Sequence, residues 1–175
     1  MFKNTIFRRM TALVLTLALA AAAALPGLAV YPMPIQTASE TEAVYLFNAD
    51  TGKTILNQNA DQQQYVASLT KLMTALLLLE SGKDLNGEVT VPTALTQEFR
   101  DIQNANGTTM GLRIGETVRR IDLLNAMLIV SANDAASVIA YDVGGSVLDF
   151  VKQMNARAQE LGCTGTNFTL SLIHI

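Results

Sequence analysis

The sequence is organised around one segment, residues 68–80, which reads Ser68-Leu69-Thr70-Lys71-Leu72-Met73-Thr74-Ala75-Leu76-Leu77-Leu78-Leu79-Glu80. Leu, Met and Ala are strong helix formers, and the segment contains no Gly or Pro before Ser81-Gly82 ends it. We therefore predict a helix over these residues. Because the helix is apolar nearly all round, we expect it to be buried on most sides and to run through the middle of a domain.

The first turn of this helix carries the motif Ser68-x-x-Lys71. Residues three apart lie on one face of a helix, so the Lys71 amine is within reach of the Ser68 hydroxyl. Apolar surroundings disfavour an ammonium ion, and an unprotonated lysine is a base that activates a serine nucleophile. Backbone N–H groups in a first helical turn lack helical partners and are available to an oxyanion. Taken alone the motif is common, and the alternative is that Ser68 caps the helix.

The composition excludes other routes to hydrolysis. The only histidine is His174, whereas a Ser-His-Asp triad needs an imidazole beside its serine and peptidase-type zinc sites need at least two histidines. We expect neither a metal nor a cofactor. Because Cys163 is the single cysteine, the chain has no intrachain disulfide, and we expect this side chain to be buried.

Residues 1–29 have the pattern of a signal peptide. Three basic residues precede an uncharged apolar run at residues 10–25, and the small-residue segment Pro26-Gly27-Leu28-Ala29 follows. An uncleaved membrane anchor is the alternative, but the run is shorter than the roughly 20 residues that span a bilayer. We expect an exported protein that acts in the periplasm or at the outer face of the cytoplasmic membrane, with a lead-in segment at residues 30–41.

The charge balance excludes nucleic acid as a partner. Removing residues 1–29 takes away three of the twelve basic residues and none of the fifteen acidic ones, which leaves a net charge of 9 − 15 = −6. A nucleic-acid-binding domain presents a basic patch or stripe to the phosphates, and this sequence has none. We expect no nucleic-acid partner.

Other segments predict a mixed α and β protein. Strands at Ala43–Phe47 and Thr54–Leu56 flank a turn and predict a hairpin in which Gly52 supplies a positive φ. A further strand is predicted at Glu88–Val91. Residues 93–119 show only turn signals at their glycines, and we assign no element to them.

The last third of the chain is helical in pattern. Helices are predicted at Arg120–Val130, Asp134–Val143 and Ser146–Leu161. In the third of these helices, apolar residues recur at helical spacing and predict one core-facing stripe: Val147, Phe150, Val151, Met154 and Leu161.

A second chemical motif, Ser131-Ala132-Asn133, follows the apolar helix at 120–130. Its alternative interpretation is again structural, because Ser131 or Asn133 could cap the next helix and Asp134 would favour the same helix N-terminus through the macrodipole.

The two motifs together resemble the first two of the three motifs of the penicillin-recognising serine enzymes, which are Ser-x-x-Lys, Ser-x-Asn and Lys-Thr-Gly. Residues 67–75 and 128–136 are similar to the corresponding segments of low-molecular-weight D-alanyl-D-alanine carboxypeptidases. The turn at residues 50–53 and the segment 154–162 are similar too. The resemblance covers residues 42–168, which would form the N-terminal part of a catalytic domain.

The resemblance implies a fold and a set of roles. The fold is α/β (α+β), the β-lactamase/DD-peptidase-like transpeptidase fold, with an antiparallel sheet, a helical subdomain and the active site between them. Ser68 would attack the carbonyl of the penultimate D-alanine of a peptidoglycan stem peptide, and Lys71 would take its proton. Ser131 would pass a proton to the leaving amine, and Asn133 would bind the substrate backbone. β-Lactams would acylate the same serine.

One family feature is absent from these 175 residues, which contain no Lys-Thr-Gly. The resemblance assigns that strand the substrate carboxylate and one oxyanion donor, so we expect this chain to be inactive or nearly so. Residues 169–175 do not match the family, and we expect the fold to be incomplete at the C-terminus through truncation or a frame error. Many relatives end in a membrane-binding helix, which would make the membrane surface a further partner of a longer protein.

Two functional alternatives remain open. A β-lactamase-like hydrolase would share the fold and the serine, but that group favours Ser-Asp-Asn where this chain has Ala132, and its deacylating Glu segment is absent here. A non-catalytic penicillin- or peptidoglycan-binding sensor would keep the pocket without turnover. Replacing Ser68 with Ala distinguishes an enzyme from a binding module.

Overall fold

The computed structural model describes residues 41–169, which form two compact units divided after Ala60. The predicted signal peptide, the lead-in up to residue 40 and residues 170–175 of the predicted tail lie outside the described residues.

The first unit contains the predicted hairpin. Strands β1 (Val44–Asn48) and β2 (Lys53–Gln58) pair antiparallel, with Leu46 opposite Leu56. Gly52 has φ 67°, a left-handed conformation that glycine adopts without steric cost. The hairpin prediction is confirmed, together with its turn glycine.

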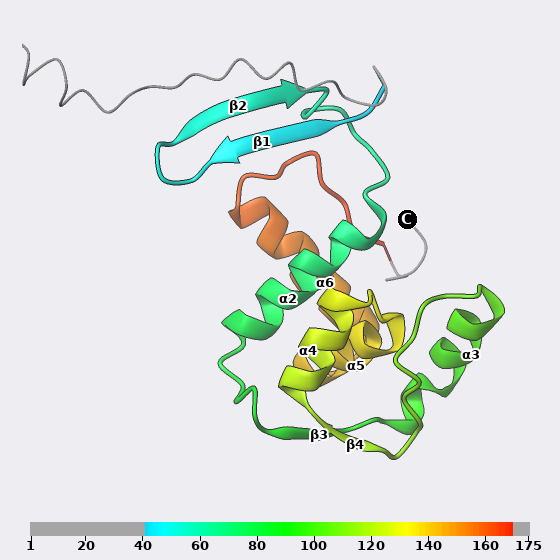
Figure 1. The fold of residues 1–175 in the computed structure, drawn as a ribbon. Helices are drawn as coiled ribbons and strands as arrows, with labels where there is room; N and C mark the ends of the chain where they lie inside the picture. Colours follow the sequence, from blue (N-terminus) through cyan, green and yellow to red (C-terminus); the bar gives the residue numbers. More distant parts are fainter. Residues whose placement is uncertain (1–40, 170–175) are drawn as a thin grey trace, which may run out of the picture. The chain divides into compact units, whose positions relative to one another are not determined.

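The second unit is mainly helical (Figure 1). Its elements in chain order are η1 (Ala67–Leu69), α2 (Thr70–Glu80), β3 (Glu88–Thr90), η2 (Thr93–Leu95), α3 (Thr96–Asn104), β4 (Thr117–Arg119), α4 (Arg120–Ile129), α5 (Asn133–Gly144) and α6 (Val147–Glu160). Strands β3 and β4 pair antiparallel, with Val89 opposite Val118. The predicted strand near Pro92 and the three C-terminal helices are confirmed.

The central helix is α5. It packs against α2, α3, α4 and α6, and all of its residues from Asn133 to Ala140 are buried. Small side chains at Ala135, Ala136 and Ala140 let neighbouring helices approach it closely from several sides. The prediction that the helix over residues 68–80 is buried on most sides and runs through the middle of the domain is therefore wrong, because α5 has that place.

Helix α2 has one buried face and one exposed face, although its sequence is apolar nearly all round. Thr74, Ala75 and Leu78 lie in the core, whereas Leu72 is 59% exposed and Leu79 is 56% exposed. The buried face carries Thr74 and Ala75 together with Leu78, whereas Leu72 and Leu79 occupy the open face. A pattern based on hydrophobicity alone cannot reveal this arrangement, because it assigns the leucines to the core.

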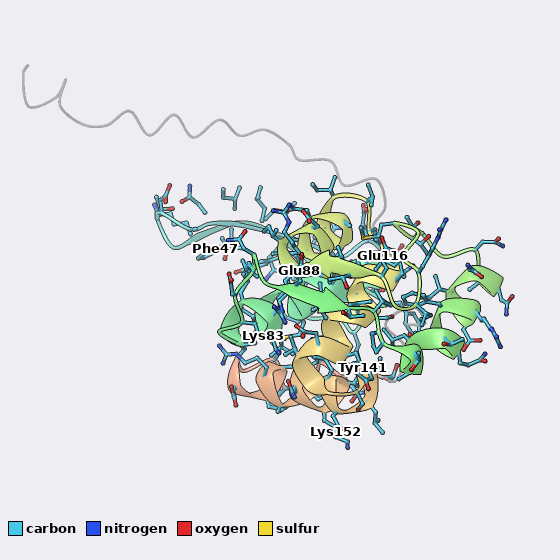
Figure 2. All side chains as sticks on the ribbon, turned by 90° about the horizontal axis from the view of Figure 1, so that it is seen from below. Phe47, Lys83, Glu88, Glu116, Tyr141 and Lys152 are labelled. Carbon is cyan, nitrogen blue, oxygen red and sulfur yellow. The ribbon has the colours of Figure 1, made fainter. Side chains whose placement is uncertain are left out.

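Helix α6 is capped at its N-terminus by Ser146, whose hydroxyl accepts a hydrogen bond from the Asp149 N–H. Phe150, Val151 and Met154 of the predicted stripe are buried, but Leu161 lies beyond the helix and is 49% exposed. The stripe is completed by another buried residue, Ala158. On the opposite side, Lys152 points away from the helix into solvent (Figure 2).

The structure differs from the sequence-based expectations for residues 93–119 and for Cys163. Residues 93–119, left without an assigned element, hold α3 and β4. Cys163 is exposed rather than buried, because it lies in a turn after α6 and not on a packed helix face.

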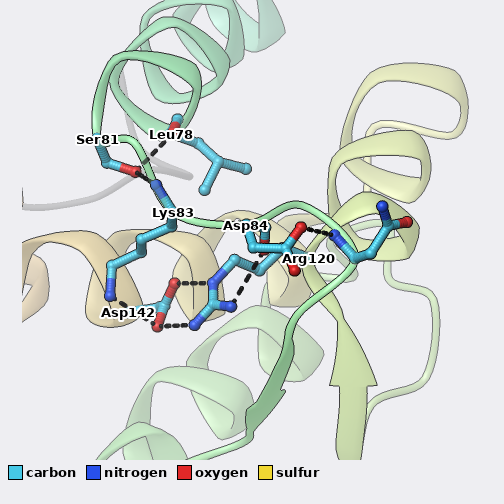
Figure 3. Close-up of polar contacts among 7 residues, drawn as sticks. Leu78, Ser81, Lys83, Asp84, Arg120 and Asp142 are labelled. Carbon is cyan, nitrogen blue, oxygen red and sulfur yellow. Dashed lines mark hydrogen bonds and ion pairs between the residues drawn. The ribbon is translucent and has the colours of Figure 1, made fainter.

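A nearly buried ion pair joins α4 to α5 (Figure 3). The Arg120 guanidinium donates to both carboxylate oxygens of Asp142, at 2.7 Å and 3.0 Å, and Lys83 approaches the same carboxylate at 3.4 Å. Burial alone would raise the pKa of Asp142, but the hydrogen bonds and charges of Arg120 and Lys83 outweigh it and hold the pKa below its ordinary value.

Within residues 41–169, no helix is both long enough and apolar enough to span a bilayer.

Candidate active site

Ser68 lies in the short helix η1 immediately before α2. The residue in front of it, Ala67, has φ 45°, a left-handed conformation that costs an alanine energy. The Ser68 side chain makes no capping hydrogen bond to either helix. The capping interpretation of Ser68 is therefore wrong. Ser68 is an exposed residue, and its hydroxyl forms hydrogen bonds with the side chains of Lys71 and Ser131.

Ser131 lies between α4 and α5 and also has a left-handed backbone, with φ 60°. The N-cap of α5 is Ala132, and no side chain caps this helix. Neither Ser131 nor Asn133 acts as the cap that the structural interpretation required. Both side chains instead point toward the amine of Lys71.

The Lys71 amine brings the four predicted residues together. Its Nζ lies 2.7 Å from Oδ1 of Asn133, 3.2 Å from Oγ of Ser131 and 3.4 Å from Oγ of Ser68. The Ser131 hydroxyl in turn donates to Oγ of Ser68 at 2.8 Å. Two hydroxyls and an amine therefore form a closed hydrogen-bonded triangle, to which the Asn133 amide is attached.

Burial sets the ionisation of this lysine. Lys71 is only 5% exposed, and desolvation lowers its pKa below the ordinary value of 10.5. The Asn133 Oδ1 atom can only accept a hydrogen bond, so it holds one N–H of the lysine in either protonation state. A neutral amine then has its lone pair available to a serine hydroxyl, as a general base requires.

A cleft of about 330 Å³ opens beside this triangle. Its polar lining is Ser68, Lys71 and Ser131. Its apolar lining consists of side chains from η1, α2, α4 and the segment before η1: Val66, Leu69, Leu72, Met127 and Leu128. An apolar cleft with a few convergent polar groups is the usual form of a ligand site.

The sequence does not reveal that residues 106–112 contact Asn133 and Asp134 at the start of α5. Residues 106–112 lie against the first residues of α5, and the Asp134 carboxylate accepts hydrogen bonds from three of their backbone N–H groups. Turn glycines were the only signal in that stretch of sequence. A turn signal gives no information on which distant helix the turn contacts.

Among residues 41–169, no group of three or more His, Cys, Asp or Glu side chains is placed to hold a metal ion.

Comparison with known proteins gives consistent matches. The family model for D-alanyl-D-alanine carboxypeptidases, peptidase family S11, matches residues 32–171. The D-alanyl-D-alanine carboxypeptidase DacF of Bacillus subtilis is 33% identical over 136 residues, which cover 76% of this chain and 33% of the relative. A D-alanyl-D-alanine endopeptidase of Pseudomonas aeruginosa is 34% identical over 136 residues, which cover 78% of this chain and 42% of the relative.

Solved structures give the same result. The Streptomyces K15 DD-transpeptidase matches with a TM-score of 0.66 at 30% identity, over 75% of this chain and 51% of that chain. Penicillin-binding protein 5 from Haemophilus influenzae matches with a TM-score of 0.59 at 32% identity, over 71% of this chain and 36% of that chain. The predicted fold class is confirmed. The chain spans less than half the length of the curated relatives described above.

Proposed function

The chain belongs to the D-alanyl-D-alanine carboxypeptidase family S11, and from this premise we propose that it carries the nucleophile and base of a serine-type D-Ala-D-Ala carboxypeptidase. The observation that carries the proposal is the hydrogen-bonded triangle of Ser68, Lys71 and Ser131. The substrate is a peptidoglycan stem peptide ending in D-Ala-D-Ala, and β-lactams acylate the same serine.

Acylation begins at the Ser68 hydroxyl. Its proton passes to neutral Lys71 while Oγ bonds to the carbonyl carbon of the penultimate D-alanine, and the carbonyl oxygen becomes an oxyanion. The Ser68 N–H, in the first turn of η1, supports that charge. When the tetrahedral intermediate collapses, its C–N bond breaks. The Lys71 ammonium then returns the proton through the Ser131 hydroxyl to the departing amine, which releases D-alanine and leaves an ester on Ser68.

Deacylation uses the same groups in reverse. A water molecule gives one proton to Lys71 and bonds through its oxygen to the ester carbonyl carbon. The C–Oγ bond then breaks, and Lys71 returns the proton to Ser68. No other proton carrier is required, because Lys71 lies within 3.4 Å of both serine oxygens.

Asn133 supports substrate binding in this proposal. Its Oδ1 accepts a hydrogen bond from Lys71, and in this proposal its Nδ2 donates to a substrate carbonyl. The apolar lining of the cleft suits the methyl groups of D-alanine residues. Export, as the signal-peptide pattern of residues 1–29 predicts, would bring this site to the peptidoglycan.

The test is acylation of the purified chain by benzylpenicillin, followed by intact-protein mass spectrometry and peptide mapping. We expect slow adduct formation on Ser68, because loss of one oxyanion donor alone costs about 10²–10³ in rate. Ser68→Ala should form no adduct, and Ser171→Ala, outside the described residues, is the matched control. Stoichiometric labelling within seconds would contradict the expectation of a nearly inactive chain, and adducts distributed over other residues would reject Ser68 as the nucleophile.

A second candidate is an endopeptidase, which the relative from Pseudomonas aeruginosa favours by its name. The chemistry on Ser68 is identical, and only the leaving group differs. A pentapeptide substrate and a cross-linked peptide dimer separate the two activities: a carboxypeptidase releases D-alanine from the first, whereas an endopeptidase cleaves the second.

A further inference from the structure

The segment Asn106–Leu112, called here the 106–112 loop, is bound to α5 by one carboxylate. Asp134 is 2% exposed, and its Oδ1 accepts the Met110 N–H at 3.0 Å. Its Oδ2 accepts the Gly111 N–H at 3.0 Å and the Leu112 N–H at 2.9 Å. Hydrogen bonds to a charged acceptor are stronger than those to a neutral one, so this carboxylate fixes the second half of the loop.

The first half of the loop contacts Asn133. The Asn133 N–H donates to the Thr108 carbonyl at 2.8 Å. A methyl group at Gly107 would lie 2.9 Å from Nδ2 of Asn133, so only a glycine lets the backbone approach this amide so closely. The loop therefore packs directly against the side chain of Asn133, which accepts a hydrogen bond from the Lys71 amine.

These contacts form one continuous path from Asp134 through the loop to Asn133, and from Asn133 Oδ1 to Nζ of Lys71 at 2.7 Å. We propose that Asp134 is a positioning residue, which acts through the 106–112 loop to hold Asn133, and with it the Lys71 amine, in register with Ser68. The catalytic meaning of this inference rests on the proposed function, whereas the positioning itself does not.

A purely structural role for Asp134 would have different consequences. The carboxylate also accepts the N–H of Ala135 within its own helix, at 2.9 Å, so its loss would loosen the start of α5 in any case. Positioning requires more than loosening, because the surroundings of the Lys71 amine must change as well. The ionisation of Lys71 is therefore the property that separates the two roles.

Asp134→Asn is the primary variant. Each carboxylate oxygen accepts two backbone N–H groups, so an amide NH2 at either position removes two of the four hydrogen bonds without changing the size of the side chain. We expect amide hydrogen exchange of Met110, Gly111 and Leu112 to accelerate at least about tenfold relative to the unmodified chain.

The second measurement is the titration of the Lys71 amine by NMR of 15N-labelled protein, with the signal assigned from Lys71→Arg. Desolvation lowers the pKa of Lys71, so admission of water through a loosened loop should move its midpoint upward. Gly107→Ala is a second variant that displaces Asn133 and leaves Asp134 intact, and it should also change the midpoint.

Asp149→Asn is the matched control. Asp149 is likewise an aspartate in the first turn of a helix, but it is bonded to Lys152 and Ser146 and is far from the loop in sequence. Both the loop exchange rates and the Lys71 midpoint should be unchanged in this variant.

A folded Asp134→Asn variant with an unaltered Lys71 midpoint would overturn the proposal, even if the loop exchanges faster. If Asp134→Asn does not fold, Gly107→Ala decides the matter, and an unaltered midpoint there overturns the proposal equally. Failure of benzylpenicillin to acylate Ser68 in the unmodified chain would count against the proposed function alone, because the exchange and titration measurements require no turnover.

Discussion

At the residue scale, the hydrogen-bonded triangle of Ser68, Lys71 and Ser131 depends on two residues with an unfavourable backbone. Ala67 and Ser131 are both left-handed without being glycine, and each lies at the point where the chain delivers a hydroxyl to the Lys71 amine. Such conformations cost an ordinary residue on the order of 1 kcal/mol and persist where surrounding contacts determine them. The site is therefore built at the expense of local stability.

This strain can be measured at Ser131. Ser131→Ala and Ser131→Gly remove the same hydroxyl, but only glycine adopts φ 60° without cost. Ser131→Gly should therefore be more stable than Ser131→Ala by about 1 kcal/mol in urea unfolding. Equal stabilities would mean that the backbone at this position is unstrained.

The depressed pKa of Lys71 predicts a pH dependence. The acylation rate should rise with pH as the ammonium loses its proton, with a midpoint below the ordinary value of 10.5. Lys71→Arg, which stays charged at all accessible pH values, should reduce the rate by about 10²–10⁴. The measurement is the rate of benzylpenicillin adduct formation between pH 6 and pH 10, and a pH-independent rate would exclude Lys71 as the base.

The residues that sequence could predict are those linked by local spacing. Ser68 and Lys71 lie three apart, so helical geometry alone predicts their proximity, and Ser131 and Asn133 follow from the resemblance of their motif. For Asp134 the sequence predicts only a favourable charge at a helix N-terminus. Its hydrogen bonds reach back more than 20 residues to the 106–112 loop, and such long-range pairing has no signature in local sequence.

At the element scale, the bounds of the helices could be predicted from the sequence, but the burial of each helix face could not. Residues 70–80, 120–129 and 147–160 are helical close to their predicted bounds. Their burial depends on which faces meet, and α5 became central because its alanines permit close packing. A hydrophobic pattern indicates which residues prefer burial, but it does not indicate which other helix will pack against them.

The ion pair between α4 and α5 gives a prediction at this scale. Asp142→Asn leaves the Arg120 guanidinium, 14% exposed, without its charged partner (Figure 3). Removing one partner of a buried pair costs about 3 kcal/mol or more, so urea unfolding at pH 7 should show a loss of that size. Asp149→Asn, in an exposed pair with Lys152, is the control and should lose little.

The same pair should make stability depend on acid. The folded pKa of Asp142 lies below the ordinary value of 3.8, so its contribution is complete above the unfolded pKa and is lost as pH falls through the folded one. Stability of the unmodified chain should therefore fall below about pH 4. The Asp142→Asn variant should show a smaller fall, and an identical fall in both would assign the acid sensitivity to other carboxylates.

At the scale of the whole molecule, family and fold class were predictable because two motifs and their flanking segments agree in order and spacing. The fold class is confirmed by structural neighbours with TM-scores of 0.66 and 0.59. The short β3–β4 sheet and α3 were only partly foreseen, since residues 93–119 lack a regular apolar period. Elements held in place by contacts with a distant helix cannot be recognised from their own composition.

Apolar side chains exposed on the second unit predict self-association. Leu69, Leu72 and Leu128 surround the cleft, and Ile129 is 79% exposed at the end of the same α4 helix. Exposed apolar patches of this kind promote association. We expect concentration-dependent oligomers in analytical ultracentrifugation, which Ile129→Lys should reduce without lowering the melting temperature. Leu148→Lys, at an exposed position of α6, is the control, and equal effects of the two would argue against a specific surface.

The exposed thiol of Cys163 gives the protein a built-in attachment point. It is the only cysteine in the sequence, and it lies just after α6, outside the residues that line the cleft. A maleimide dye or a nitroxide will therefore modify the folded chain at one defined atom, with a stoichiometry of one. Fluorescence anisotropy or electron paramagnetic resonance from that atom can report unfolding and association of the unaltered sequence, with no engineered cysteine.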